Sequence, residues 1–183
     1  ADLSGTTDTV IIKSSGANVD TLIGIENITG TSGNDTIFGD GGDNTLISGA
    51  GNDILEGGAG DDYLDGGADI DTVFYNQATS GVNVNLGTTA LQNVGGGQGN
   101  DTLIDIENVI GSGFADTFKG NNSVSNTFNG GMNLSTQVEN INDENDTVDY
   151  STLTGVTDKI IVDLSNTSSA NVQVIVAGAA QGA

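Results

Sequence analysis

Aspartate recurs at a fixed spacing in the first half of this chain, always at the end of a glycine-rich stretch. Five blocks of nine residues follow one another without a gap from residue 30 to residue 74: GTSGNDTIF, GDGGDNTLI, SGAGNDILE, GGAGDDYLD and GGADIDTVF. The sixth position of these blocks is occupied in turn by Asp35, Asn44, Asp53, Asp62 and Asp71. Carboxylate and backbone carbonyl oxygens are the ligands that hard divalent cations prefer. The pattern therefore indicates repeated metal binding through oxygen.

The composition excludes several other kinds of chemistry. The 183 residues include no histidine and no cysteine, so they offer no serine–histidine triad, no cysteine nucleophile, no ordinary zinc site and no disulfide bond. The formal net charge of −22 has the wrong sign for nucleic-acid binding. No apolar run approaches the roughly 18 residues of a membrane-spanning helix. We therefore expect a protein that is not an enzyme, binds no nucleic acid and has no transmembrane segment.

Each block predicts a tight turn followed by a very short strand. Its first six residues are rich in glycine and end in aspartate, which suits a turn that exposes backbone carbonyls. Its last three residues alternate, so that the apolar residue at the eighth position points inward. That position is occupied by Ile37, Leu46, Leu55, Leu64 and Val73. Two blocks then make one coil of 18 residues, and stacked coils predict an all-β fold, a parallel β-roll with strands about 4.8 Å apart.

The predicted register brings the carboxylates of successive coils close together. Asp35, Asp53 and Asp71 line one edge of the roll, and Asn44 and Asp62 line the other. Stacked carboxylates repel one another, and several calcium ions between the turns would remove that repulsion. Asp53 would then serve two ions, whereas the neutral Asn44 would weaken its site. The alternative is that aspartate only satisfies the geometry of the turns.

The candidate metal-binding residues include the sixth-position side chains and the glycines of the turns. A further block at residues 96–104, GGQGNDTLI, adds Asp101, and the Asp-Thr pair at residues 116–117 adds Asp116. The complete set is Asp35, Asp53, Asp71, Asn44, Asp62, Asp101, Asp116, Gly33, Gly49, Gly51, Gly58, Gly60 and Gly67.

These blocks resemble the hemolysin-type calcium-binding repeats of RTX proteins, whose pattern is G-G-x-G-x-D-x-U-x. The resemblance implies a β-roll with calcium held between adjacent turns. It also implies export of the unfolded chain through a type I apparatus and folding in calcium-rich surroundings. The chain departs from the pattern at Asn44, at Asp69 in a glycine position and at Ser48 in the first position of its block.

A longer segment recurs at an offset of 81 residues. Residues 20–27, DTLIGIEN, match residues 101–108, DTLIDIEN. We predict that both copies form coils that widen the roll, with Ile25 and Ile106 buried. Glu26 and Glu107 are either calcium ligands or capping groups of a turn, and the capping role is favoured.

A second recurrence pairs residues 71–75 with residues 146–150. An alternating segment follows each copy, at residues 82–86 and 160–164, and each predicts a longer strand. Tyr75 and Tyr150 are interpreted as packing residues rather than as a platform for a ligand.

The chain is predicted to be one elongated solenoid without a linker. Residues 1–29 form irregular leading coils, 30–74 regular repeats, 75–95 a wider strand section, 96–120 a second repeat module, 121–145 a protruding loop and 146–183 closing strands. Because residue 1 is not methionine, we expect a piece of a longer chain or a processed product.

Three interpretations of function remain open. The favoured one is a calcium-binding structural segment of a secreted bacterial surface protein, of the surface-layer, filament or adhesin type, that folds when it binds calcium. The second is the non-catalytic C-terminal region of a secreted toxin, protease or lipase. The third is a sugar-binding module. The expected partners are neighbouring modules of the same protein, other copies of it, or cell-surface glycans, and the expected location is extracellular.

Overall fold

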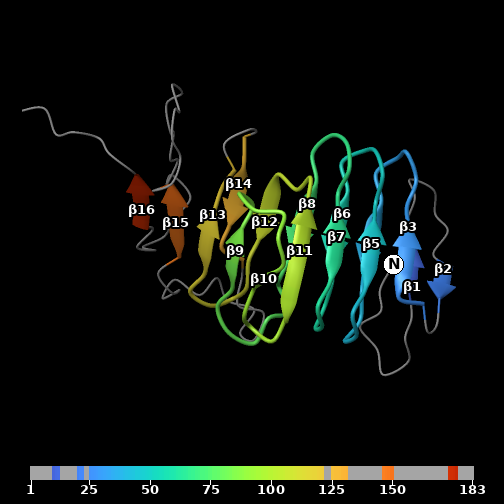
Figure 1. Cartoon of the computed structure of the whole chain (residues 1–183), viewed down its shortest axis with the longest axis horizontal. Helices are drawn as coiled ribbons and strands as arrows, with labels where there is room; N and C mark the ends of the chain where they lie inside the picture. The colour runs from blue at the N-terminus through green and yellow to red at the C-terminus, as the bar shows by residue number, and fades with distance from the viewer. Residues whose placement is uncertain are drawn as a thin grey trace, which may run out of the picture.

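The computed structural model describes residues 10–12, 20–22, 25–121, 125–131, 146–150 and 173–176. In these residues the regular structure consists of short strands, with no helix. The strands stack side by side along the long axis of the molecule (Figure 1). The all-β prediction is thereby confirmed.

Within the described residues, the strands form three principal sheets and one small pair. The first sheet, in spatial order, contains β10 (Gln92–Asn93), β11 (Asn100–Ile104), β7 (Tyr63–Asp65), β5 (Thr45–Ile47) and β3 (Asn27–Thr29). The second contains β14 (Thr127–Asn129), β12 (Asn108–Ile110), β8 (Thr72–Phe74), β6 (Ile54–Glu56) and β4 (Thr36–Phe38). The third contains β16 (Gln173–Val176), β15 (Thr147–Tyr150), β13 (Thr117–Lys119) and β9 (Asn83–Asn85). The remaining pair is β1 (Val10–Ile12) with β2 (Asp20–Leu22).

The first two sheets are built from coils of two nine-residue blocks. β4 pairs in parallel with β6 and β6 with β8, while β5 pairs in parallel with β7. Each of these pairings joins residues 18 positions apart, as Ile37 with Leu55 and Leu46 with Leu64. The structure thus confirms the predicted parallel roll and its two-block coil.

The interior contains one apolar residue from each short strand. In the typical strand the middle residue is buried and its two neighbours are partly exposed. The second sheet stacks Ile37, Leu55, Val73 and Val109, and the first sheet stacks Ile28, Leu46, Leu64 and Leu103. All eight side chains are at most 5% exposed, so both predicted apolar ladders are confirmed and continue beyond the blocks that predicted them.

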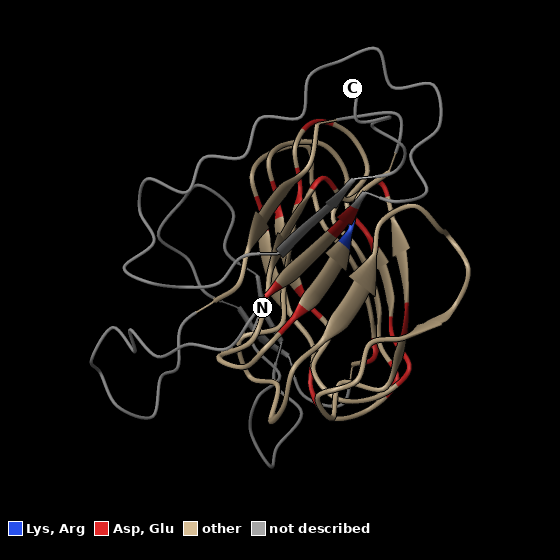
Figure 2. Cartoon of the chain, turned by 90° about the vertical axis from the view of Figure 1, so that its left-hand side faces the viewer, with Lys and Arg blue, Asp and Glu red and all other residues tan. Residues whose placement is uncertain are grey.

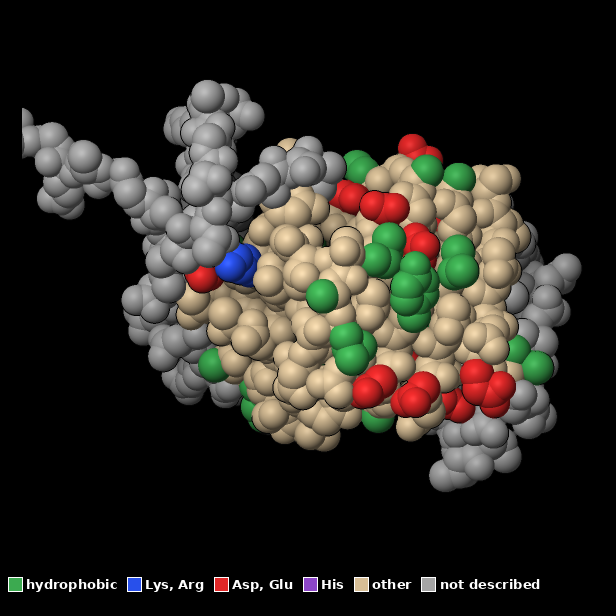
Figure 3. All heavy atoms as spheres, in the orientation of Figure 1, with side chains coloured by type: hydrophobic (Ala, Val, Ile, Leu, Met, Phe, Trp, Pro, Cys, Tyr) green, Lys and Arg blue, Asp and Glu red, His purple; other side chains and the backbone are tan. Residues whose placement is uncertain are grey.

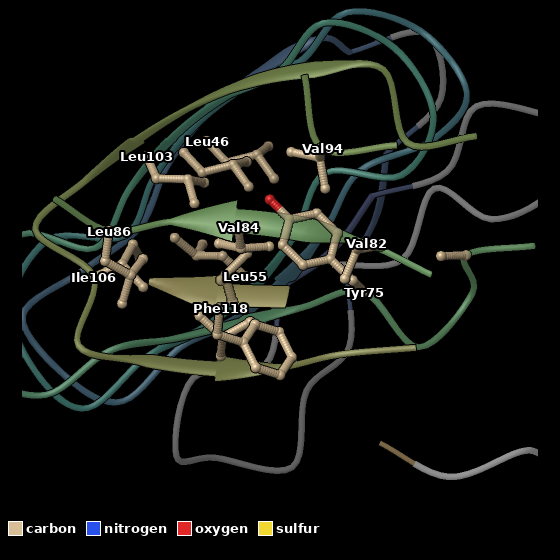
Figure 4. Packing of buried hydrophobic residues seen from close by; sticks show 14 of the residues in the cluster. Leu46, Leu55, Tyr75, Val82, Val84, Leu86, Val94, Leu103, Ile106 and Phe118 are labelled. Atoms are coloured by element: carbon tan, nitrogen blue, oxygen red, sulfur yellow. The ribbon is translucent and has the colours of Figure 1, made fainter. Parts of the chain in front are cut away.

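After β8 the coil becomes roughly twice as long. The chain builds β9 and then the two-residue β10, which pairs antiparallel with β11 at the edge of the first sheet. Hydrogen bonds between equivalent positions now span 39, 36 and 34 residues instead of 18. The extra length forms the third sheet, in which β9 pairs in parallel with β13. A larger core fills this wider part, and it includes Tyr75, Val84 and Phe118 (Figure 4).

The two copies of the 81-residue recurrence adopt different structures. In the first copy β2 lies antiparallel to β1, and Asn27 begins a strand of the first sheet. In the second copy β11 belongs to the first sheet, and Asn108 begins a strand of the second sheet. Ile106 is buried as predicted, but the prediction for Ile25 is wrong because that side chain is 40% exposed.

Three predictions concern the later part of the chain. β14 lies within residues 121–145, so the predicted loop is wrong for Thr127–Asn129. The alternating segment at residues 160–164 lies outside the described residues. Within the predicted closing strands of residues 146–183, the structure describes β15 and β16.

Candidate metal centres

The sixth position of each block stands immediately before a strand, and parallel pairing aligns these positions in columns. The first column precedes the first sheet and contains Glu26, Asn44, Asp62 and Asp101. The second column precedes the second sheet and contains Asp35, Asp53, Asp71, Glu107 and Asn126. The third column precedes the third sheet and contains Val82, Asp116 and Asp146. Acidic residues accordingly mark the turns at the edges of the roll (Figures 2 and 3).

Within each column, a carboxylate links one coil to the coil before it. The backbone N–H of Asp35 donates to Oδ1 of Asp53 at 2.7 Å, and that of Asp53 donates to Oδ1 of Asp71 at 2.8 Å. In the first column the N–H of Asn44 donates to Oδ1 of Asp62 at 2.8 Å. Each bond joins residues 18 positions apart, so the structure brings the predicted residues together as the repeat requires.

One oxygen of several of these carboxylates remains without a hydrogen-bond donor. Among the described residues, Asp35 Oδ1 and the Oδ2 atoms of Asp53, Asp62 and Asp71 are buried and have no partner. A buried, unpaired carboxylate oxygen destabilises a fold by an amount on the order of several kcal/mol unless a cation or a donor meets it. Oxygens of this kind are the ligands that calcium prefers, so these residues fit a calcium ion.

The electrostatic surroundings favour the binding of a cation. Burial raises the pKa of Asp62 to about 7, and the negative charge of Asp101 adds to this effect. Burial likewise raises the pKa of Asp71 to about 7, with further contributions from the charges of Asp53 and Glu107. The ionised carboxylates are therefore unfavourable in the metal-free roll at neutral pH, and a bound divalent cation would stabilise them.

The predicted glycines allow successive turns to stack at backbone contact. Gly49, Gly51, Gly58, Gly60 and Gly67 all have a positive φ, between +85° and +119°. At Gly58, a Cβ atom would overlap the carbonyl oxygen of Asp40 in the preceding coil. Gly33 differs, since a Cβ atom there would meet only the Thr31 hydroxyl, 3.9 Å away. Close stacking brings backbone carbonyls near the carboxylates, where they can complete the oxygen ligands of an ion.

The three departures from the repeat have distinct consequences. Asn44 accepts the N–H of Asp40 through Oδ1 at 2.8 Å and so keeps the shape of the turn without its charge. Asp69 adopts a φ of 82°, which is unfavourable for any side chain and ordinarily requires glycine. Ser48 is buried and donates its hydroxyl to the carbonyl oxygen of Gly66 at 2.8 Å.

Glu107 takes a place in the second column that the sequence did not reveal. Its Oε2 accepts the N–H of Asp71 at 2.9 Å, as the carboxylate of a next aspartate would do. This bond agrees with the favoured capping role, since it satisfies a backbone donor of the preceding coil. The sequence does contain a signal for this place. Glu107 stands directly before the strand that begins at Asn108, just as an aspartate stands directly before the strands that begin at Thr36 and Thr72.

A second series of hydrogen bonds at the fifth position was also missed. Asn52 donates its N–H to Asn34 Oδ1 at 3.0 Å, and Asp61 donates its N–H to Asp43 Oδ1 at 2.9 Å. The direction is opposite to that of the sixth-position bonds, because here the later coil provides the donor. The sequence signal for this series is that five of the six blocks have asparagine or aspartate as their fifth residue.

Asp101 and Asp116 occupy column positions but differ from the aspartates between Asp35 and Asp71. Asp101 Oδ2 accepts the hydroxyl hydrogen of the buried Tyr75 at 2.9 Å. Tyr75 is thus a packing residue, as predicted, that also makes a specific polar contact. Asp116 Oδ2 accepts the N–H of Ser112 at 2.8 Å.

The acidic side chains are spread over successive turns, with at most two in the turn of any one block. Within the part of the chain that the structure describes, no three acidic side chains gather in one metal-binding cluster. An ion bound here must therefore take most of its ligands from backbone carbonyls, water and carboxylates of different turns. The same described residues contain no helix that could span a membrane.

Comparison with known proteins identifies the repeats. The family model described as the RTX calcium-binding nonapeptide repeat, which comprises four copies, matches residues 20–55 and again residues 39–73. A search of curated proteins gives no match. Repeats of this family bind calcium ions and are not catalytic. Residues 20–73 of this chain are therefore similar to the RTX calcium-binding nonapeptide repeat.

Proposed function

We propose that this chain is a calcium-binding structural segment of a secreted bacterial surface protein of the surface-layer, filament or adhesin type. In this proposal the chain leaves the cell unfolded through type I export and folds outside, where calcium is abundant. The observation that supports the proposal most is the row of buried carboxylate oxygens without donors at Asp35, Asp53, Asp62 and Asp71. Such a row makes folding depend on calcium, because metal binding then supplies folding free energy.

The proposal is tested by circular dichroism of the chain in a calcium titration from a chelated start. We expect a spectrum with little β structure in chelator and a cooperative gain of β signal at about 10⁻⁴–10⁻³ M calcium, the range of extracellular calcium modules. Magnesium at equal concentration is the control, because it demands a tighter octahedral site. A β-rich spectrum that persists unchanged in excess chelator would contradict the proposal.

A structural role further implies assembly with neighbouring modules or with other copies of the chain. Calcium lowers the self-repulsion of a chain with a net charge of −22 and should favour such contacts. Light scattering across the same titration tests this point. Growth of the particle with calcium supports the surface-protein context. A strictly monomeric particle at high calcium and high protein concentration favours the alternative context, the C-terminal region of a secreted toxin, protease or lipase.

A second candidate function, sugar binding, is favoured by a polar hollow on the third sheet. The hollow has a volume of about 380 Å³ and is lined by Asn83, Asn85, Gln92, Asn93, Thr117, Lys119 and Asp149. Gln92 fixes one wall, since its amide accepts the N–H of Asn85 at 2.7 Å and donates to the Asn85 carbonyl at 3.1 Å. Amide and hydroxyl groups that can both donate and accept match the hydroxyl groups of a saccharide.

This candidate is tested by binding of a panel of soluble oligosaccharides to the calcium-loaded chain. Asn83→Ala should weaken binding about tenfold if its amide contacts the sugar. Asn27→Ala is the matched control, because Asn27 is an exposed asparagine on β3, a strand that does not line the hollow. Equal binding by the two variants, or no binding by the parent chain, would exclude the hollow as a sugar site.

A further inference from the structure

Each carboxylate oxygen of Asp101 accepts a donor from the protein. Its Oδ1 accepts the N–H of Asp62 at 3.2 Å, and its Oδ2 accepts the hydroxyl hydrogen of Tyr75 at 2.9 Å. Asp101 is 0% exposed and Tyr75 is 1% exposed. In Figure 4 the Tyr75 ring lies among the core side chains next to Val82 and Val84, with its hydroxyl directed toward the first sheet. Packing therefore holds the hydroxyl in place.

Asp116 is occupied in a different way. Its Oδ1 accepts the N–H of Val82 at 2.8 Å and the hydroxyl hydrogen of Ser112 at 2.7 Å. Its Oδ2 accepts the backbone N–H of Ser112 at 2.8 Å. Both residues are at most 1% exposed. Ser112 stands four residues before Asp116, so a single turn provides two donors to its own carboxylate.

The aspartates of the regular blocks offer a clear contrast. Asp53, Asp62 and Asp71 each use Oδ1 in the column bond and leave Oδ2 buried without a donor among the described residues. Asp35 is intermediate, because Thr31 donates to its Oδ2 at 2.7 Å through the backbone N–H while its Oδ1 has no donor. Among the aspartates of the first and second columns, the buried oxygens without a donor therefore end at Asp62 and Asp71.

We propose that Tyr75 ends the row of calcium sites in the first column and that Ser112 keeps calcium from Asp116 in the third column, so that Asp101 and Asp116 hold protein donors in place of calcium. This inference rests on calcium binding by the repeats and fixes where that binding stops. Calcium at Asp101 Oδ2 would have to compete with a hydroxyl group whose ring is packed in the core. At Asp116 it would have to displace both donors of Ser112 and leave them buried without acceptors, which is unfavourable. The sequence pattern GGQGNDTLI at residues 96–104 therefore predicts a calcium ligand that the structure assigns to another role.

The first test is the number of calcium ions bound, measured by titration calorimetry on Asp62→Asn, Asp101→Asn and Asp116→Asn. These substitutions keep the side-chain shape and the column acceptor but remove the charge. Asp62→Asn should lose one ion or bind it about tenfold more weakly. Asp101→Asn and Asp116→Asn should bind the same number of ions as the parent chain. Loss of an ion from Asp101→Asn to the same extent as from Asp62→Asn would overturn the inference.

The second test is Tyr75→Phe, which keeps the ring in the core and removes only the hydroxyl. Asp101 Oδ2 then becomes a buried oxygen without a donor, like that of Asp62, and we expect one additional calcium ion. The matched control is Tyr63→Phe, since Tyr63 is 38% exposed on the outer face of β7. An unchanged ion count in Tyr75→Phe would refute the role of Tyr75. If Asp101→Asn does not fold, Tyr75→Phe decides alone.

Failure of this inference is distinguishable from failure of the proposed function. A parent chain that binds no calcium would contradict both. A parent chain that binds calcium and folds with it, but loses an ion in Asp101→Asn, would contradict only the boundary at Tyr75.

Discussion

Residues 30–74 and residues 75–119 form two sections of one roll, and they satisfy their carboxylates by different means. The first section has coils of 18 residues and leaves carboxylate oxygens buried without donors. The second has column bonds that span 34 to 39 residues, and its aspartates receive donors from Tyr75 and Ser112. The hydrogen bonds of the first and second columns run through both sections. The presence of aspartate in the column therefore does not decide where calcium binds, whereas the presence of an internal donor does.

The two sections also differ in the size of their cores. Each strand of the first section contributes a single Ile, Leu or Val to the interior. The second section adds Tyr75, Val82, Val84, Leu86 and Val94, and Phe118 stacks on Phe128 with ring centroids 5.3 Å apart. A larger buried apolar area stabilises a fold without help from a metal. Calcium dependence should consequently be concentrated in the first section.

The largest single-residue effect is expected at Gly58, where close stacking of the first section depends on the absence of a side chain. In Gly58→Ala the new Cβ would meet the Asp40 carbonyl oxygen, and its φ of +99° is unfavourable for alanine. We expect a loss of about 3 kcal/mol in the free energy of unfolding of the calcium-loaded chain, measured by denaturant titration. Gly41→Ala is the control, because a Cβ there meets nothing within 4 Å. Similar losses in the two variants would contradict the stacking of turns.

The next effect distinguishes a central from a terminal carboxylate of the second column. Asp53 accepts the N–H of Asp35 and donates its own to Asp71, so it joins three successive coils. Asp53→Ala should raise the calcium concentration needed for folding about tenfold, and Asp35→Ala should raise it about threefold. The calcium midpoint of circular dichroism measures both. Equal shifts would show that each carboxylate serves one turn only.

A smaller effect, of opposite sign, is expected at Asn44. Asn44→Asp adds a carboxylate at a position whose Oδ1 already accepts the Asp40 N–H at 2.8 Å. The calcium midpoint should fall about twofold to threefold, because an added ligand charge raises affinity. Asp43→Asn is the comparison variant, because it removes a negative charge from the same turn at the fifth position of the block. A higher midpoint in Asn44→Asp would mean that this turn binds no ion.

The smallest effect is the response of the metal-free first section to pH. The pKa values of Asp62 and Asp71 are raised to about 7, so the folded form holds more protons than the unfolded chain between about pH 4 and pH 7. In chelator, the small β signal of the metal-free chain should therefore fall further as the pH rises from about 4 to about 7. Calcium affinity should change in the opposite sense and weaken by up to about tenfold per pH unit below 7 for each proton released on binding. Calorimetry at pH 5.5 and pH 8 tests the sign, and equal affinities would contradict it.

The sequence predicts the first section well because every coil there repeats the same nine-residue pattern. The partners of Ile37, Leu46 and Asp35 all follow from adding 18 to their numbers. No such rule gives the partner of Asp71, since Glu107 lies 36 residues away in a segment without the glycine-rich turn. The contact of Tyr75 with Asp101 depends on how the widened coil packs, which no short-range pattern encodes. Ile25 is a further case in which a sequence pattern does not give the structure. It occupies the same place as Ile106 in the recurring segment, yet Ile25 is exposed and Ile106 is buried.

The central claim is that calcium dependence belongs to the first section and diminishes beyond Tyr75. Hydrogen–deuterium exchange, read peptide by peptide during a calcium titration, tests it most directly. As calcium is removed, we predict that amides of β4 to β8 lose protection first, and that amides of β9, β11 and β13 lose it at a lower calcium concentration. Loss of protection in both sections at one calcium concentration, with all eight strands exchanging together, would contradict the account.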